Sequence, residues 1–112
     1  MNDTTRSQGQ KVAVIINPIS GAGRRRDVAR IRAEQAAALV EKRRLNAEVF
    51  VTERPGHARE LALAGLRRGV MMFVAWGGDG TVNEVGSALV GSDATLAIVP
   101  SGSGNGLARE LG

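Results

Sequence analysis

The stretch VMMFVAWGGDGTVNEV, residues 70–85, places an apolar run directly before two glycines and an aspartate. The apolar run has the length and the composition of a strand that is buried on both faces. Beyond the glycines, Val82, Val85 and Leu89 follow the i, i+3, i+7 spacing of a helix face, which predicts a helix over residues 81–90. The stretch therefore predicts a strand, a glycine-rich turn and a helix.

The rest of the chain alternates in the same way. Strands are expected at 11–17, 46–52, 70–76 and 95–100, and helices at about 25–44, 55–69 and 81–90, with a last helix after the loop SGSGN. This order predicts an α/β fold, a three-layer doubly wound domain with a mainly parallel sheet. We expect residues 1–10 to form a disordered polar tail and residues 11–112 to form one domain.

The helix expected at residues 25–44 has a charged side and an apolar side. The expected helix at 25–44 has a strongly charged outer side, which predicts a solvated surface. Its apolar side is expected to consist of Val28, Ile31, Ala36, Ala38 and Leu39.

The composition restricts the classes of partner. The chain has no cysteine, which excludes disulfides and thiolate metal sites, and only 3% aromatic residues with no tyrosine, which disfavours base-stacking platforms. A net charge of +4 favours anionic partners such as nucleotides or a membrane surface, and no pattern indicates a specific nucleic-acid site. No apolar run reaches the roughly 20 residues of a membrane span, so we expect a cytoplasmic protein with peripheral membrane contact left open.

Three loops should meet at one edge of this sheet. NPISGAG, GGDGTVN and SGSGN each follow an expected strand, and the carboxyl ends of parallel strands share the edge where ligands bind. Glycine lets the backbone approach a phosphate closely and adopt positive φ, and a following helix start favours anions. The three loops therefore predict a phosphate-binding site. The turn after the second strand, TERPG, is ordinary except for Thr52 at its start.

The acidic residue in the second of these loops, Asp79, has two readings. It could hold Mg²⁺ or orient an attacking hydroxyl, or it could be only a turn residue or the N-cap of the helix that follows. Asn17 and Ser20 could likewise contact a ligand or only cap the first turn. The chain has no G-x-x-x-x-G-K-[ST] motif, and its match to the dinucleotide fingerprint is weak.

Taken in order, NPISGAG, GGDGTVNEV and PSGSGNGLAREL resemble the catalytic domain shared by diacylglycerol kinases, sphingosine kinases and bacterial lipid kinases, over residues 11–112. The resemblance implies an N-terminal nucleotide-binding domain that uses ATP and Mg²⁺, with Asp79 as the candidate catalytic and Mg²⁺-linked residue. It places nucleotide-contacting residues at Asn17, Pro18, Ser20, Gly21, Thr52, Gly77, Gly78, Asp79, Gly80, Thr81, Asn83, Ser103, Gly104 and Asn105. Ser103 and Gly106 differ from the residues that are usual at these positions of the diacylglycerol-type motif, so the identity of the lipid acceptor is left open.

The resemblance also implies a reaction and a missing part. The reaction is phosphorylation of diacylglycerol or of a sphingoid-type hydroxyl at a membrane surface. The family's β-rich C-terminal domain, with the main general base, is expected beyond these residues, so this stretch alone should be inactive. A domain of the NAD kinase type, which shares the GGDGT string, and a non-catalytic nucleotide-binding module are the alternatives, and a homodimer is left open.

Overall fold

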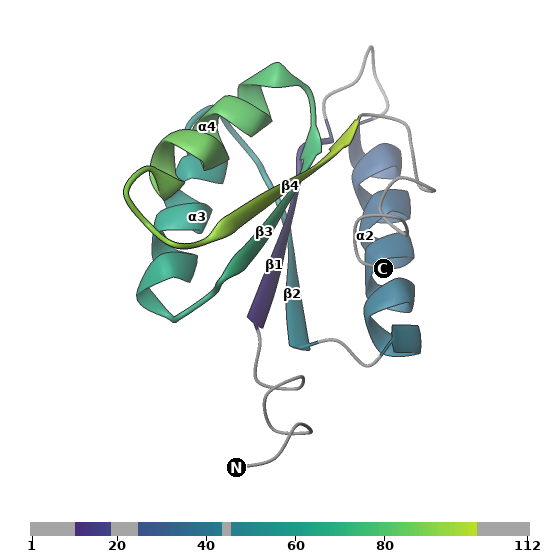
Figure 1. Ribbon diagram of the computed structural model, residues 1–112. Coiled ribbons are helices and arrows are strands. Elements are labelled where there is room, and N and C mark those ends of the chain that lie inside the picture. Colours follow the sequence, from purple (N-terminus) through teal and green to yellow (C-terminus); the bar gives the residue numbers. More distant parts are fainter. Residues whose placement is uncertain (1–10, 19–24, 44–45, 101–112) are drawn as a thin grey trace.

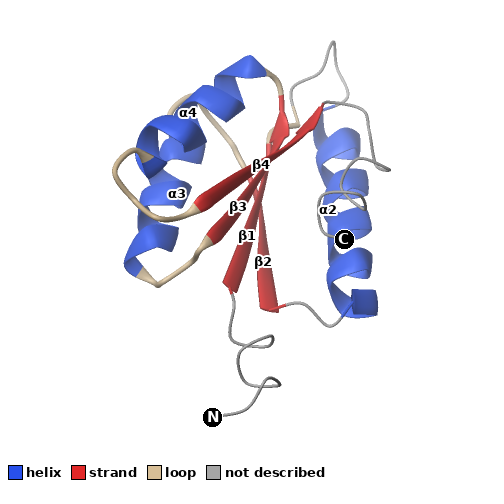
Figure 2. Cartoon of the chain, viewed as in Figure 1, coloured by secondary structure: helices blue, strands red, loops and turns tan. Residues whose placement is uncertain are grey.

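The structure is a computed structural model that describes residues 11–18, 25–43 and 46–100. Strands and helices alternate along these residues (Figure 1 and Figure 2). The elements are β1 (Lys11–Ile16), α2 (Arg25–Arg43), β2 (Asn46–Val51), α3 (His57–Arg67), β3 (Met72–Gly77), α4 (Asp79–Leu89) and β4 (Thr95–Pro100). The expected disordered tail at residues 1–10 lies outside the described residues.

The strands form one parallel sheet in the order β2-β1-β3-β4. Helix α2 lies on one face of the sheet, and α3 and α4 lie together on the other (Figure 1). These three layers confirm the predicted α/β doubly wound fold. The chain moves outward from β1 to β2 and then crosses back to β3 on the other side of β1. The carboxyl ends of β1 and β3 therefore flank the point where strand order reverses, which is where ligands bind in such sheets.

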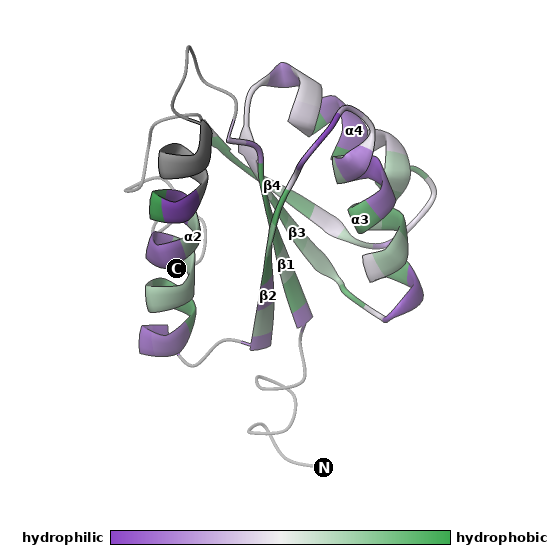
Figure 3. Cartoon of the chain, turned by 180° about the vertical axis from the view of Figure 1, so that it is seen from behind, coloured by the Kyte–Doolittle hydropathy of each residue, from purple (hydrophilic) through white to green (hydrophobic). Residues whose placement is uncertain are grey.

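The two central strands, β1 and β3, are buried on both faces, which accounts for their continuous apolar runs in the sequence. Along β1, Ala13 and Ile15 face α3 and α4, whereas Val12, Val14 and Ile16 face α2. The hydropathy colouring in Figure 3 shows the apolar strands between helices that are mainly hydrophilic on their outer sides. Burial on alternate sides fixes which side chains of each strand point toward which helix.

Some element ends differ from the predicted ones. The helix expected at 55–69 covers only His57–Arg67, because Gly56 and Gly69 adopt left-handed backbone conformations, with φ of 87° and 89°. The helix expected at 81–90 begins two residues earlier, at Asp79. Its N-cap, Gly78, is extended rather than helical, so the turn after β3 is shorter than the sequence suggested.

The inward face of α2 also differs from the prediction. Ile31 is 46% exposed and Ala38 is exposed, whereas Arg32 is only 6% exposed and lies on the same face as the buried Ala36. The expected apolar side is thus wrong at Ile31 and Ala38, because the face that meets the sheet is rotated toward Arg32. Leu39 does pack against the α2-side core as expected.

Candidate functional site

The site begins where β1 and β3 end side by side. Ile16 is in register with Trp76, so Asn17 and Gly77 follow as neighbours. The backbone nitrogen of Asn17 donates to the Trp76 carbonyl at 2.9 Å. The Asn17 side-chain Nδ2 donates to Oγ1 of Thr81 at 2.8 Å. The loop after β1 is therefore joined to the first turn of α4, as expected for residues that share one edge of the sheet.

The three described glycines of the GGDG turn have different roles. A Cβ at Gly77 would lie 2.8 Å from Thr81 Oγ1 and 2.9 Å from Asn17 Cβ, so only glycine fits there. At Gly78 and Gly80, no described atom lies within 4 Å of a built Cβ. None of these three glycines has positive φ, so that one of the two expected reasons for their presence is wrong. Gly77 allows close packing within the protein, and the open space at Gly78 and Gly80 would let a ligand reach the backbone.

Asp79 is the first residue of α4, and the N-cap of this helix is Gly78. The N-cap reading of Asp79 is therefore wrong. Asp79 is exposed, and no hydrogen bond or ion pair to its carboxylate occurs within the described residues. A carboxylate in the first turn is favoured by the helix dipole, but no internal contact requires this one.

The described ranges contain no cluster of three or more His, Cys, Asp or Glu side chains that could hold a metal ion.

The loop that follows β2 joins the site through the backbone of Thr52. Its amide nitrogen donates to the Ile16 carbonyl at 2.8 Å, and the residue is 7% exposed. Thr52 therefore lies beside the end of β1, near Asn17. Pro18 is buried in the same region, and Asn83 lies exposed on α4.

Glu84 of α4 holds the start of α3. Its carboxylate accepts from the backbone nitrogens of Gly56 at 2.9 Å, Ala58 at 3.1 Å and Arg59 at 3.4 Å. The N-cap Gly56 has no side chain, so a carboxylate from another helix fills that role. Glu84 thereby fixes the loop between β2 and α3 against α4, the helix that begins in the GGDG turn.

An arginine at the same loop is paired on the surface. Arg54 contacts both carboxylate oxygens of Glu60, at 2.9 and 2.8 Å. This hydrogen bond lowers the pKa of Glu60 and raises the pKa of Arg54. Both groups are exposed, so the pair helps to shape the loop and adds little to stability.

Arg32 reaches the site from α2. Its Nη1 donates to the backbone carbonyl of Asn17 at 2.8 Å, and its guanidinium carbon lies 5.6 Å from the centre of the Trp76 ring. Burial lowers the pKa of Arg32. Asn17 is thus held on one side by Arg32 and on the other by Thr81.

Sequence reasoning overlooked Arg32 and gave Glu84 no role. An arginine among other arginines on a charged helix is normally solvated, so nothing local marked Arg32. The available signal for Arg32 is its helical spacing, four residues before Ala36 and seven before Leu39. Gly56 just before a helix, without an N-cap side chain of its own, was the signal that another group must cap it.

Several expected site residues lie outside the described residues, namely Ser20, Gly21, Ser103, Gly104 and Asn105. The described site residues Asn17, Gly77 and Thr81 are in direct contact, and Gly78, Asp79 and Gly80 continue the same turn. The residues that follow the first and third strands, β1 and β3, therefore meet at one edge of the sheet. The loop SGSGN lies outside the described residues, and its part in the site stays a prediction.

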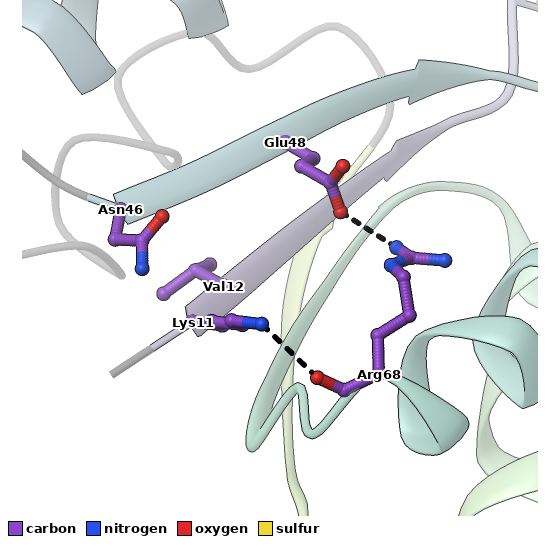
Figure 4. A pocket seen from close by; sticks show the side chains of 5 residues that line it. All are labelled: Lys11, Val12, Asn46, Glu48 and Arg68. Carbon is purple, nitrogen blue, oxygen red and sulfur yellow. Dashed lines mark hydrogen bonds and ion pairs between the residues drawn. The ribbon is translucent and has the colours of Figure 1, made fainter. Parts of the chain in front are cut away.

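A cavity of about 270 Å³ opens at the opposite edge of the sheet, lined by Lys11, Val12, Asn46, Glu48 and Arg68 (Figure 4). Arg68 pairs with Glu48 at 2.6 Å, and Lys11 Nζ donates to the Arg68 carbonyl at 3.1 Å. The charged groups of this cavity bind one another, and they tie α3 to the amino ends of β1 and β2. None of the predicted site residues lines it.

Comparison with known proteins gives a consistent result. A family profile described as the diacylglycerol kinase catalytic domain matches residues 11–112. The chain is 36% identical over 103 residues to a diacylglycerol kinase of Mycobacterium tuberculosis, covering 91% of this chain and 32% of that protein. It is 41% identical over 83 residues to a YegS-like lipid kinase of Pseudomonas aeruginosa, covering 70% of this chain and 28% of that protein.

Solved structures agree with these matches. The chain superposes on a diacylglycerol kinase from Bacillus anthracis with a TM-score of 0.61 at 28% identity, covering 84% of this chain and 31% of that one. It therefore spans about a third of the length of the relatives that it matches. Within the described part of the chain, no helix is long and apolar enough to cross a membrane.

Proposed function

Because this chain belongs to the diacylglycerol kinase catalytic-domain family, we propose that it is the nucleotide-binding domain of an ATP-dependent lipid kinase. The observation that carries the proposal is the arrangement after β3. Gly78 and Gly80 face open space, and Asp79 between them has no partner within the described residues. Both features are unused by the fold, and they lie where strand order reverses.

The binding mode follows from these groups. Backbone N–H groups in the first turn of α4 have no intrahelical acceptor and attract phosphate oxygens. Asn17 and Thr81 support this turn from the side of β1, so that the first and third strand ends act together. Asp79 is the residue that would hold the Mg²⁺ accompanying ATP, and the ion would reduce the repulsion between this carboxylate and the phosphates.

The reaction is transfer of the γ-phosphoryl group to a lipid hydroxyl. The acceptor oxygen forms the new P–O bond and loses its proton, while the bond to the β-phosphate oxygen breaks and ADP leaves. Positioning and charge stabilisation dominate such transfers. This domain holds the phosphates in line and organises the metal, and the family's β-rich domain provides the main general base and the lipid pocket. The acceptor is diacylglycerol or a sphingoid base, and the +4 charge assists at an anionic membrane.

Nucleotide binding is tested by calorimetric titration of the chain with ATP-Mg²⁺. Wild type is expected to bind, and Asp79→Asn to lose at least tenfold in affinity for ATP-Mg²⁺ with little change for ATP in EDTA. Because Asp79 is exposed and without a described partner, its free energy of unfolding should change by less than about 0.5 kcal/mol. Equal affinity of both proteins for ATP-Mg²⁺ would remove Asp79 from the site.

Phosphoryl transfer is tested in a chimera. The chain replaces the matching segment of the Bacillus subtilis diacylglycerol kinase, to which it is 31% identical over 105 residues. With labelled ATP, the chimera should label diacylglycerol or sphingoid lipid in vesicles, and the Asp79→Asn chimera should not. Label in NAD alone would support the NAD kinase reading. Nucleotide binding without label in any acceptor would support a non-catalytic module.

A further inference from the structure

Arg32 is a buried cation that the proposed mechanism does not use. It lies on the inward face of α2, and only 6% of the residue is exposed. Of its five N–H donors, one has an acceptor within the described residues, the carbonyl of Asn17 at 2.8 Å. Its remaining described contact is the face of the Trp76 ring, 5.6 Å from the ring centre to the guanidinium carbon.

Among the described residues, no carboxylate forms an ion pair with Arg32. The ion pairs of the described residues involve Arg30, Arg54 and Arg68, and none involves Arg32. An arginine stays protonated at neutral pH, and a buried charge without a counter-charge is unfavourable. The Trp76 ring offsets part of this cost by a cation–π interaction. Trp76 is itself buried, and its indole N–H has no hydrogen-bond acceptor within the described part of the chain.

The position of this charge connects it to the phosphate-binding turn. Arg32 holds the backbone carbonyl of Asn17, whose side chain donates to Thr81 in the first turn of α4. Trp76, beneath the guanidinium, directly precedes Gly77 in the turn itself. The uncompensated charge therefore lies behind the edge at which the phosphates of a nucleotide would bind. Burial also reduces screening of this charge by salt.

We infer that Arg32 is a specificity-determining residue of the nucleotide site, which uses its uncompensated charge to favour ligands that carry phosphate groups over nucleosides. The inference rests on the proposed function. The negatively charged ligand supplies a counter-charge for the Arg32 guanidinium. The two charges attract each other across the Asn17 carbonyl, without direct contact. The protein thus has a cation that is costly without ligand and favourable with it.

This role predicts opposite effects on stability and binding. Arg32→Met keeps an unbranched side chain of similar reach and removes the charge, so the ligand-free protein should unfold at an equal or higher temperature. Its affinity for ATP should fall at least tenfold, whereas its affinity for adenosine should stay the same. Arg30→Met is the matched control, because Arg30 is on the same helix but exposed, with its guanidinium paired to Glu34 at 3.3 Å.

The experiment titrates wild type, Arg32→Met, Arg32→Lys and Arg30→Met with adenosine, AMP, ADP and ATP-Mg²⁺ by calorimetry, alongside thermal unfolding. Trp76, the single tryptophan of the chain, gives a second signal through its fluorescence. In wild type, Arg30→Met and Arg32→Lys, affinity should rise with the number of phosphates. In Arg32→Met, this rise should be largely lost.

Two results would overturn the inference while leaving the proposed function intact. One is Arg32→Met binding all four ligands as wild type does. The other is a lower unfolding temperature together with equal losses for adenosine and ATP, which would mean a purely structural role. If Arg32→Met does not fold, an Arg32→Lys protein that binds ATP no better than adenosine also contradicts the inference. Wild type that binds none of the four ligands would overturn both the inference and the proposed function.

Discussion

Gly77 shows how one residue without a side chain joins two loops. It allows Asn17 of the first strand end to lie against Thr81 of α4, and the Asn17–Thr81 hydrogen bond of 2.8 Å depends on this approach. Gly78, its neighbour, has no described atom within 4 Å of a built Cβ. Two adjacent glycines thus serve different purposes, and substitution separates them.

Gly77→Ala should destabilise the fold, because the new Cβ would lie within 2.9 Å of atoms on both neighbouring elements. Overpacking of this kind costs about 1–3 kcal/mol, measurable by urea unfolding. Gly78→Ala is the control. Its φ of −90° suits alanine, so its free energy of unfolding should stay within about 0.5 kcal/mol of wild type. Its ATP affinity should fall, because the Cβ occupies the space a phosphate would enter. Equal stability losses in the two variants would contradict this distinction.

The helices show the same division between support and binding. α4 begins with the turn that we assign to phosphates, and one turn later it provides Glu84 as the cap of α3. The second loop, which carries Thr52 beside β1, is therefore held by the same helix as the first site residues. A ligand that orders the start of α4 should also order the start of α3.

Glu84→Gln should weaken the start of α3, since a neutral amide replaces a carboxylate that accepts from three backbone nitrogens. Loss of a helix cap costs about 0.5–2 kcal/mol, and amide hydrogen exchange should quicken at Ala58 and Arg59. Glu34→Gln on α2 is the matched control, because Glu34 is exposed and pairs only with Arg30. It should change stability by less than about 0.5 kcal/mol. Similar exchange rates in both variants would argue against capping by Glu84.

The pair of Arg54 and Glu60 predicts a pH effect at the same loop. The Arg54 hydrogen bond lowers the pKa of Glu60 in the folded state relative to the unfolded state. Its contribution to stability is therefore present above the unfolded pKa of about 4.3 and is lost as the pH falls through the lower folded value. In Arg54→Met, the Glu60 pKa measured by NMR should rise toward its ordinary value, and stability should fall less between these pH values. An unchanged Glu60 pKa would contradict the pairing.

At the scale of the whole molecule, the sequence predicted more of the fold than of the site. All four strands of the described sheet were predicted from the sequence. The signal was strongest for β1 and β3, because a strand buried on both faces needs a continuous apolar segment. Helix ends were less well predicted, because Gly56 and Gly69 set them through backbone conformation rather than through periodicity. The inward turn of Arg32 depends on a partner, Asn17, that lies 15 positions away in the chain.

The sequence predicted the glycine-rich turn after β3, and it gave no role to the residues that support this turn from other elements. Gly77, Asp79 and Thr81 were expected together because they lie within five consecutive positions, and Asn17 joins them through strand order. Arg32 and Glu84 act through contacts between separate elements, which local patterns do not contain. The edge of the sheet was therefore predictable, but not the groups behind it.

The central claim, that nucleotide binds at the carboxyl edge of this sheet, is tested most directly by an NMR titration of the ¹⁵N-labelled chain with ATP-Mg²⁺. We predict saturable shifts of the backbone amides of Gly78, Asp79, Gly80 and Thr81 and of the indole N–H of Trp76. The amides of Lys11 and Arg68, beside the cavity at the opposite edge, should not move. Shifts confined to that cavity, or no shifts at millimolar ATP-Mg²⁺, would contradict the claim.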